Sequence, residues 1–101
     1  MNVFYSGMVN LEKTDLLYGG LENENNWMLK KIEVSNITEE TNLKLLYNDD
    51  TIFDETITVE GLDENNLAIF NVDVNVSDYL LQGTSDVLGI RLLLYVEETS
   101  K

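Results

Sequence analysis

Apolar and polar residues alternate strictly through residues 70–77. The apolar positions of that segment are Phe70, Val72, Val74 and Val76. A period of two residues is typical of a β-strand with one buried face and one solvated face. The pattern therefore predicts a strand here, with these four side chains directed toward a core.

Three more segments, 27–34, 42–47 and 51–59, follow the same rule and predict three more strands. Their expected buried positions are Met28, Ile32 and Val34 in the first, Leu43, Leu45 and Tyr47 in the second, and Ile57 and Val59 in the third. Two looser strand patterns, within 3–11 and at 15–18, precede them. Each of these segments would present one apolar face to a shared core.

The segment 87–96 is almost continuously apolar. One face would hold Leu88, Ile90, Leu92, Leu94 and Val96, and the other Gly89, Arg91, Leu93 and Tyr95. A strand covered on both faces has this composition, as does a buried helix. The turn-forming residues 83–86 and the embedded glycine favour the strand. We expect Leu93 and Tyr95, on the second face, to form a contact between subunits.

Polar turns separate these strands. Residues 48–50 join two of them at hairpin spacing, and residues 21–26, 36–41 and 61–66 predict longer loops. One helical turn is expected over Tyr79–Leu81, capped by Ser77 or Asp78 and ended by Gly83. No segment predicts a helix long enough for a crossover between parallel strands.

These elements predict one fold class. It is an all-β, antiparallel β-sandwich of about seven strands, jelly-roll or immunoglobulin-like in form, with at most one short helical turn. No linker or change of composition divides the chain, so we expect residues 1–101 to form a single domain.

Charge and composition narrow the function. The net charge of -13 repels phosphate backbones and anionic lipids, so we expect neither nucleic-acid nor membrane binding. The chain has no histidine and no cysteine, and it carries no phosphate-binding or nucleophile motif. We therefore expect no enzyme activity and no cofactor. The apolar runs are too short for a membrane span and residues 1–5 lack a basic region, so no signal peptide is expected.

Two features are candidate sites with a simpler interpretation. Asp49, Asp50, Asp54 and Glu55 flank one hairpin, and such oxygen ligands suit calcium, but their spacing does not match an EF-hand loop. A solvated acidic turn is the favoured interpretation. Trp27 is favoured as a core residue over an interface anchor.

The segment Val3-Phe4-Tyr5 is unusually apolar for a terminus, which indicates that it pairs into the sheet or docks on a partner. The predicted interface residues are Val3, Phe4, Tyr5, Trp27, Leu93 and Tyr95.

Three stretches, 14–18, 27–47 and 79–88, occur in an order that resembles small β-sandwich proteins of tailed-phage particles. Leu17-Tyr18 ends a short strand, and Ile32-Glu33-Val34-Ser35-Asn36 ends the next. A hairpin strand follows at 42–47, and a turn containing leucine, glycine and aspartate opens the last strand. In this sequence Gly19-Gly20 and an Asn/Glu-rich loop replace the proline and glycine that usually follow the first strand.

The resemblance implies a non-enzymatic virion component: a capsid decoration or auxiliary protein, a head-fibre base, or a tail or neck adaptor. It would be located in the virion, which is assembled in the host cytoplasm, and it would bind other virion proteins and copies of itself. The alternative is an acidic, DNA-mimicking inhibitor that blocks a basic site on a host nucleic-acid enzyme. A carbohydrate- or calcium-binding module is a third hypothesis.

Overall fold

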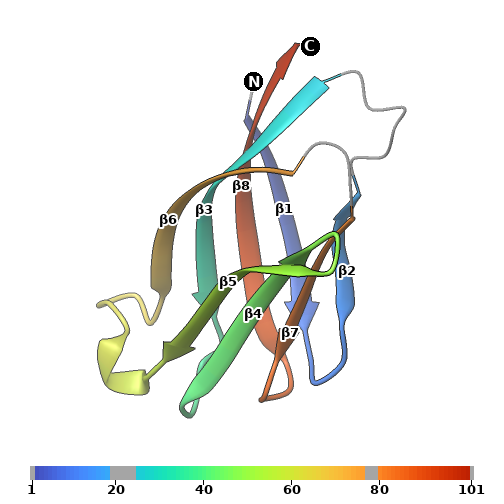
Figure 1. The fold of residues 1–101 in the computed structure, drawn as a ribbon. Helices are drawn as coiled ribbons and strands as arrows, with labels where there is room; N and C mark the ends of the chain where they lie inside the picture. Colours follow the sequence, from blue (N-terminus) through green and yellow to red (C-terminus); the bar gives the residue numbers. More distant parts are fainter. Residues whose placement is uncertain (1, 19–24, 77–79, 101) are drawn as a thin grey trace.

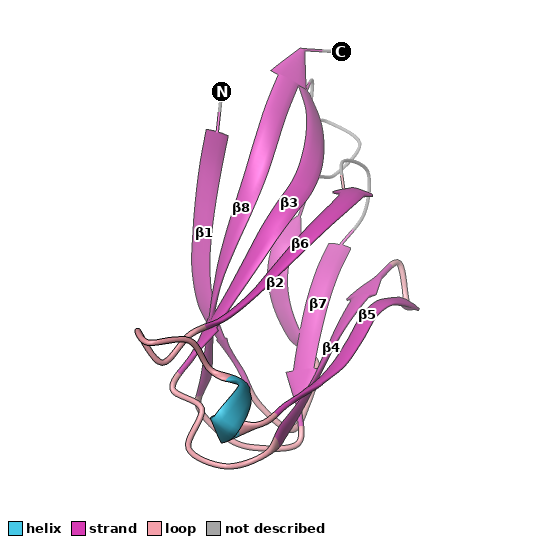
Figure 2. Ribbon diagram, turned by 90° about the vertical axis from the view of Figure 1, so that its left-hand side faces the viewer, coloured by secondary structure: helices cyan, strands magenta, loops and turns pink. Residues whose placement is uncertain are grey.

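The computed structural model describes residues 2–18, 25–76 and 80–100. The expected helix caps Ser77 and Asp78, together with Tyr79 and most of the expected 21–26 loop, lie outside these residues. The described chain forms two antiparallel four-stranded sheets, which lie face to face as separate layers (Figures 1 and 2). The first sheet contains, in spatial order, β1 (Asn2–Val9), β8 (Ile90–Ser100), β3 (Asn25–Ser35) and β6 (Ala68–Asn75). The second contains β2 (Thr14–Tyr18), β7 (Leu80–Ser85), β4 (Thr41–Tyr47) and β5 (Asp50–Ile57).

The strand order decides between the two sandwich forms that the pattern allowed. A hairpin joins β4 to β5 within one sheet, whereas every other connection crosses to the opposite sheet. This arrangement of eight strands in two sheets is the jelly roll. In an immunoglobulin-like sandwich the first two strands would instead lie side by side in one sheet.

The strand β7 contains Leu80 and Leu81 of the expected helical turn, and it raises the strand count from about seven to eight. Leu81 is fully buried, and β7 pairs with β2 on one side and β4 on the other. Gly83 does not end a helix. A Cβ there would lie 2.7 Å from Val9 Cγ1 and 2.9 Å from Leu16 Cδ1, so the glycine admits close packing between the sheets.

The helical turn of the described residues lies elsewhere, at the 3-10 turn η1 (Val59–Gly61). Thr58 caps it, because its Oγ1 accepts a hydrogen bond from the Gly61 amide at 3.2 Å. Val59, which the alternation predicted to be buried, is therefore exposed at the surface. No helix in the described part of the chain has the length and apolar character needed to cross a bilayer.

The core between the sheets follows the predicted alternation in most strands. The buried positions that confirm it are Leu43 and Leu45 in β4, Ile57 in β5, and Ile90, Leu92, Leu94 and Val96 in β8. Phe70, Val72 and Val74 point to the core side of β6 but remain partly exposed, because β6 is an edge strand. Leu88 is an exception, since it lies before β8 in a turn where Gly89 has a φ of 76°.

A β-bulge in β3 makes the buried face of this strand differ from the predicted one. The register with β8 shifts between Leu29 and Lys31, which leaves Lys30 as an extra residue of β3 opposite β8, and the register with β6 also shifts at this point. Such a residue reverses the side-chain alternation on one side of it. Leu29 is therefore buried in place of Met28, while Ile32 and Val34 are buried as predicted.

The predicted hairpin turn at residues 48–50 is confirmed. Asn48 and Asp49 have φ angles of 53° and 66°, and they connect β4 directly to β5. Two central residues with positive φ define a type I′ turn, whose twist matches that of the flanking strands. Asn and Asp tolerate this conformation better than most residues, which is why the turn could be recognised from the sequence.

Candidate functional site

The outer side of the first sheet carries apolar and cationic side chains that the core does not use. We call this surface the β8 face, after its central strand. Its described side chains include Ser6, Met8, Lys31, Glu33, Ile69, Arg91, Leu93 and Tyr95. The register aligns four side chains across the four strands: Ser6, Leu93, Glu33 and Ile69. Two residues farther along β1 and β8, it aligns Met8 with Arg91. Residues distant in the sequence therefore form one continuous surface.

Tyr95 is held on this face by two charged neighbours. The Lys31 ammonium lies 4.2 Å from the centroid of the Tyr95 ring, and Lys31 also contacts Glu33 at 3.4 Å. Partial desolvation of the phenol raises the pKa of Tyr95 above its ordinary value, and its hydrogen bond to Glu33 raises that pKa further. The Lys31 charge acts in the opposite direction. These two contacts favour one orientation of the ring, as suits a contact residue.

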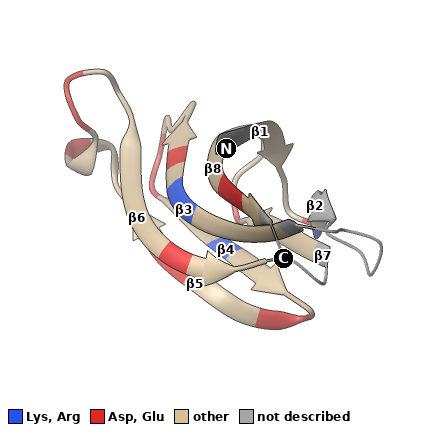
Figure 3. Cartoon of the chain, turned by 90° about the horizontal axis from the view of Figure 1, so that it is seen from above, with Lys and Arg blue, Asp and Glu red and all other residues tan. Residues whose placement is uncertain are grey.

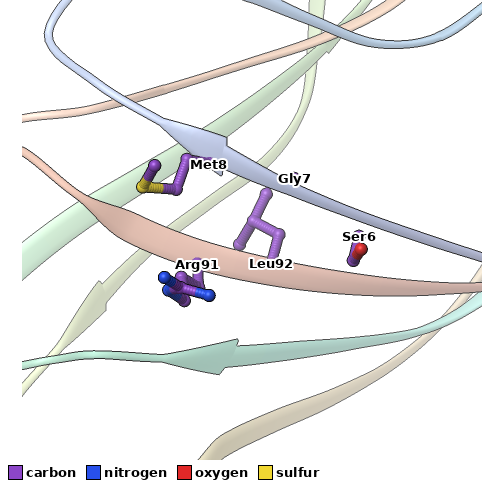
Figure 4. A pocket seen from close by; sticks show the side chains of 5 residues that line it. All are labelled: Ser6, Gly7, Met8, Arg91 and Leu92. Carbon is purple, nitrogen blue, oxygen red and sulfur yellow. The ribbon is translucent and has the colours of Figure 1, made fainter.

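Met8 and Ile69 extend the apolar part of the β8 face toward its two edges. Their exposed fractions are 48% and 44%, and Leu93 lies half-buried between them. Near Met8 the surface is hollowed by a shallow depression of about 240 Å³, shown in Figure 4. The residues that line it are Ser6, Gly7, Met8, Arg91 and Leu92. Arg91 is exposed beside this depression and supplies a positive charge on an acidic molecule.

The predicted interface residues do not all lie on this face. Leu93 and Tyr95 do. Val3 and Phe4 belong to β1 by their backbones, but their side chains lie outside the described part of the structure. Tyr5 points to the core side, where its Cε1 would lie 3.0 Å from a Cβ at Gly7.

Trp27 is also on the core side of the first sheet. Its ring packs against the core, and its Nε1 donates a hydrogen bond of 2.8 Å to Glu98 Oε2. Its carbonyl oxygen accepts a hydrogen bond from the Val76 amide, also at 2.8 Å. These contacts favour the structural role that the sequence suggested for the tryptophan.

Two of the four acidic residues of the β4–β5 hairpin have separate partners. Asp49 pairs with Lys13 at 3.3 Å, and Asp54 accepts a hydrogen bond of 2.8 Å from Asn42. Asp54 and Glu55 are consecutive in a strand, so their side chains point to opposite faces. Asp50 lies at the other end of that strand. Within residues 2–18, 25–76 and 80–100, no group of three such side chains is placed to hold a metal ion.

The remaining acidic residues are spread over several loops and strands, as Figure 3 shows. Glu39 and Glu40 lie between β3 and β4, whereas Glu60, Asp63 and Glu64 lie between β5 and β6. Some of them have structural roles: Asp63 accepts hydrogen bonds from the amides of Asn65 and Leu67. The described carboxylates therefore do not gather into one dense stripe.

A second apolar feature lies at the loop end of the sandwich. Leu11 and Leu88 are 58% and 67% exposed, on the β1–β2 loop and the β7–β8 turn. Hydrogen bonds connect the two segments, including one of 3.1 Å from the Gly89 amide to Asn10 Oδ1. Sequence reasoning missed these residues, as it missed Met8 and Ile69, because their exposure depends on contacts between distant strands.

Comparison with known proteins adds no relative: no family model matches the chain, and no curated protein matches it. The functional argument therefore depends on the fold, the β8 face and the charge of the molecule.

Proposed function

We propose that this chain is a non-enzymatic structural protein of a tailed-phage particle, of the capsid decoration, auxiliary or head/tail adaptor kind. It acts by binding virion proteins and copies of itself. The observation that carries the proposal is the β8 face. There Leu93, Tyr95 and Met8 place apolar surface outside a core that is already complete.

The composition of the β8 face supports protein binding in particular. Inner-face residues of β8 already fill the core, so Leu93 and Tyr95 contribute little to it. Tyrosine, methionine and arginine are enriched where proteins meet, and Tyr95, Met8 and Arg91 share the β8 face. Because its contacts with Lys31 and Glu33 favour one orientation, the Tyr95 ring loses less conformational entropy when a partner covers it.

The jelly-roll fold supports a role in a phage particle by analogy with other viral proteins. Jelly rolls recur in viral capsid domains, although the same fold also serves lectins and enzymes. The stretches that resemble phage β-sandwich proteins correspond to β2, to β3 with β4, and to β7. A net charge of -13 also keeps such a protein from binding unselectively before it assembles.

The acidic-inhibitor hypothesis is less well supported by the described surface. A DNA mimic needs carboxylates spaced along one face like phosphates, and here they are divided among separate loops and strands. Binding to phage particles distinguishes the virion proposal from the inhibitor proposal.

Co-sedimentation with gradient-purified phage particles tests the proposed function, using particles produced without this gene. The protein is expected to bind them in many copies. Leu93→Ser is expected to weaken binding by about tenfold or more, because burial of a leucine stabilises a contact by about 1.5–3 kcal/mol. Leu88→Ser makes the same change at the exposed loop end and is expected to bind normally.

Two results would count against a virion role. One is the absence of particle binding by a folded protein. The other is a tight complex with a basic nucleic-acid enzyme that weakens steeply with salt, which would support the inhibitor instead.

A further inference from the structure

The four edge strands of the two sheets differ in charge. The edges are β1 and β6 in the first sheet and β2 and β5 in the second. Three of them carry carboxylates, namely Asp15 in β2, Asp73 in β6, and Asp50, Asp54 and Glu55 in β5. The fourth, β1, spans eight residues and contains no charged residue, and the chain has no proline.

Charged residues on an edge strand prevent it from pairing with another strand. An edge exposes backbone N–H and C=O groups that a further strand satisfies, and charge or proline blocks such pairing. The described structure has this protection on β2, β5 and β6 but not on β1. One side of β1 pairs with β8 along its whole length, from Asn2 to Val9, and no strand of the sheet pairs with its other side.

We infer that the free edge of β1 pairs with the β1 edge of a second copy of this chain, in antiparallel orientation about a two-fold axis. The two four-stranded sheets then join into one continuous eight-stranded sheet. Such a contact is isologous, which is the commonest form of a protein dimer. The two β8 faces come to lie side by side on one surface.

The charges at the two ends of the β8 face favour a second copy in antiparallel orientation as the occupant. With a net charge of -13, two copies repel each other, and repulsion is weakest where both present uncharged edges. The outer positions of β8 begin with Arg91, opposite Met8, and end with Glu97, opposite Asn2. Antiparallel pairing brings the Arg91 end of one copy toward the Glu97 end of the other. Parallel pairing would align like charges.

The dimer specifies how copies of the chain bind one another, and it does not depend on the proposed binding to virion proteins. A dimer that binds no particle would uphold this inference and overturn the function. A protein that binds particles but stays monomeric in solution would do the reverse.

Sedimentation velocity over a range of protein concentrations tests the inference on the full chain. The native protein is expected to form dimers, and added salt is expected to strengthen them because it screens the repulsion between copies. A protein that remains monomeric at every concentration and salt level would overturn the inference.

A pair of matched substitutions locates the contact. Ser6→Lys places a charge on the outer side of β1, where the native side chain is exposed. We expect it to raise the dimer dissociation constant by about tenfold or more. Asn71→Lys makes the same charge change at an exposed position of β6, the opposite edge of the same sheet, and is expected to leave the dimer intact. Equal dimerisation of all three proteins, or equal loss in both variants, would contradict pairing through β1.

Spin labels give a readout that does not depend on weakening the dimer. The chain has no cysteine, so Ser6→Cys and Asn71→Cys each provide one labelling site. Strands in a sheet lie about 4.8 Å apart, so backbones at position 6 would be about 5 Å apart across the dimer and those at position 71 about 34 Å apart. Labels that are close at position 71 and distant at position 6 would refute the arrangement.

Discussion

Tyr95 shows how one residue connects the β8 face to stability. Its phenol is partly desolvated and donates a hydrogen bond to Glu33, and both effects favour the neutral form and raise its pKa. Lys31 stacks on the ring and also contacts Glu33, so three side chains from two strands form one unit. The sequence places Tyr95 on the outer face of its strand. Its partners Lys31 and Glu33 are adjacent to it only because β3 pairs with β8.

This unit predicts a stability change at alkaline pH. Because the pKa of Tyr95 is raised on folding, its contribution is fully present below the ordinary tyrosine pKa of about 10. That contribution is lost as the pH rises through the higher value of the folded protein. Urea denaturation at a series of alkaline pH values is expected to show a steeper loss of stability for the native protein than for Tyr95→Phe.

The comparison isolates Tyr95 from a second group that titrates nearby. The hydrogen bond from Lys30 to Asp73 raises the pKa of Lys30 as well, so Lys30 also contributes stability that is lost at high pH. Tyr95→Phe leaves this pair in place, so the two proteins share its contribution. Parallel stability curves for the two proteins would refute the assigned role of Tyr95.

At the scale of the element, β7 is where local sequence was least informative. Residues 77–83 have capping residues, a leucine pair and a glycine, which together are typical of a helical turn. In the structure β7 lies between β2 and β4, and the backbone hydrogen bonds and core contacts of these two neighbours outweigh the local preference. The bulge at Lys30 has a similar origin, because it lets both Leu29 and Ile32 reach the core.

Two leucine-to-alanine substitutions test the assignment of β7. Leu81→Ala is expected to lower the free energy of unfolding by about 2–5 kcal/mol, because Leu81 is fully buried between the sheets. Leu88→Ala, in an exposed turn, is expected to change it by less than about 0.5 kcal/mol. Chemical denaturation measures both. A small effect at Leu81 would be inconsistent with a central strand at this position.

At the scale of the whole molecule, charge and topology act together. The chain carries 19 acidic and 6 basic residues, and the described carboxylates are spread over loops, three of the four edge strands and the central strands β3 and β8. This distribution limits unselective association, but it also adds repulsion within the folded domain. The β8 face, the β1 edge and the loop end with Leu11 and Leu88 are apolar or uncharged surfaces on this acidic molecule.

The repulsion predicts that salt stabilises the fold. Raising the salt concentration from about 0.01 M to about 0.15 M shortens the Debye length from about 30 Å to about 8 Å and screens the separated carboxylates. The thermal midpoint is therefore expected to rise with sodium chloride. Dilute protein should be used, so that dimer formation does not contribute to the shift. A midpoint that falls with salt would indicate that attractive ion pairs dominate instead.

The sequence by itself determined the fold class, most strands and the faces of β4 and β8, because side-chain alternation is a local property of an extended chain. It also determined the hairpin at Asn48 and Asp49, since a type I′ turn depends on its own two residues. The tertiary structure alone decided the jelly-roll order, the strand at β7 and the placement of β1 at an edge. Met8, Leu93 and Ile69 likewise share a surface only through strand pairing. These features depend on which distant segments pair, and the periodicity within one strand carries no information about its neighbours.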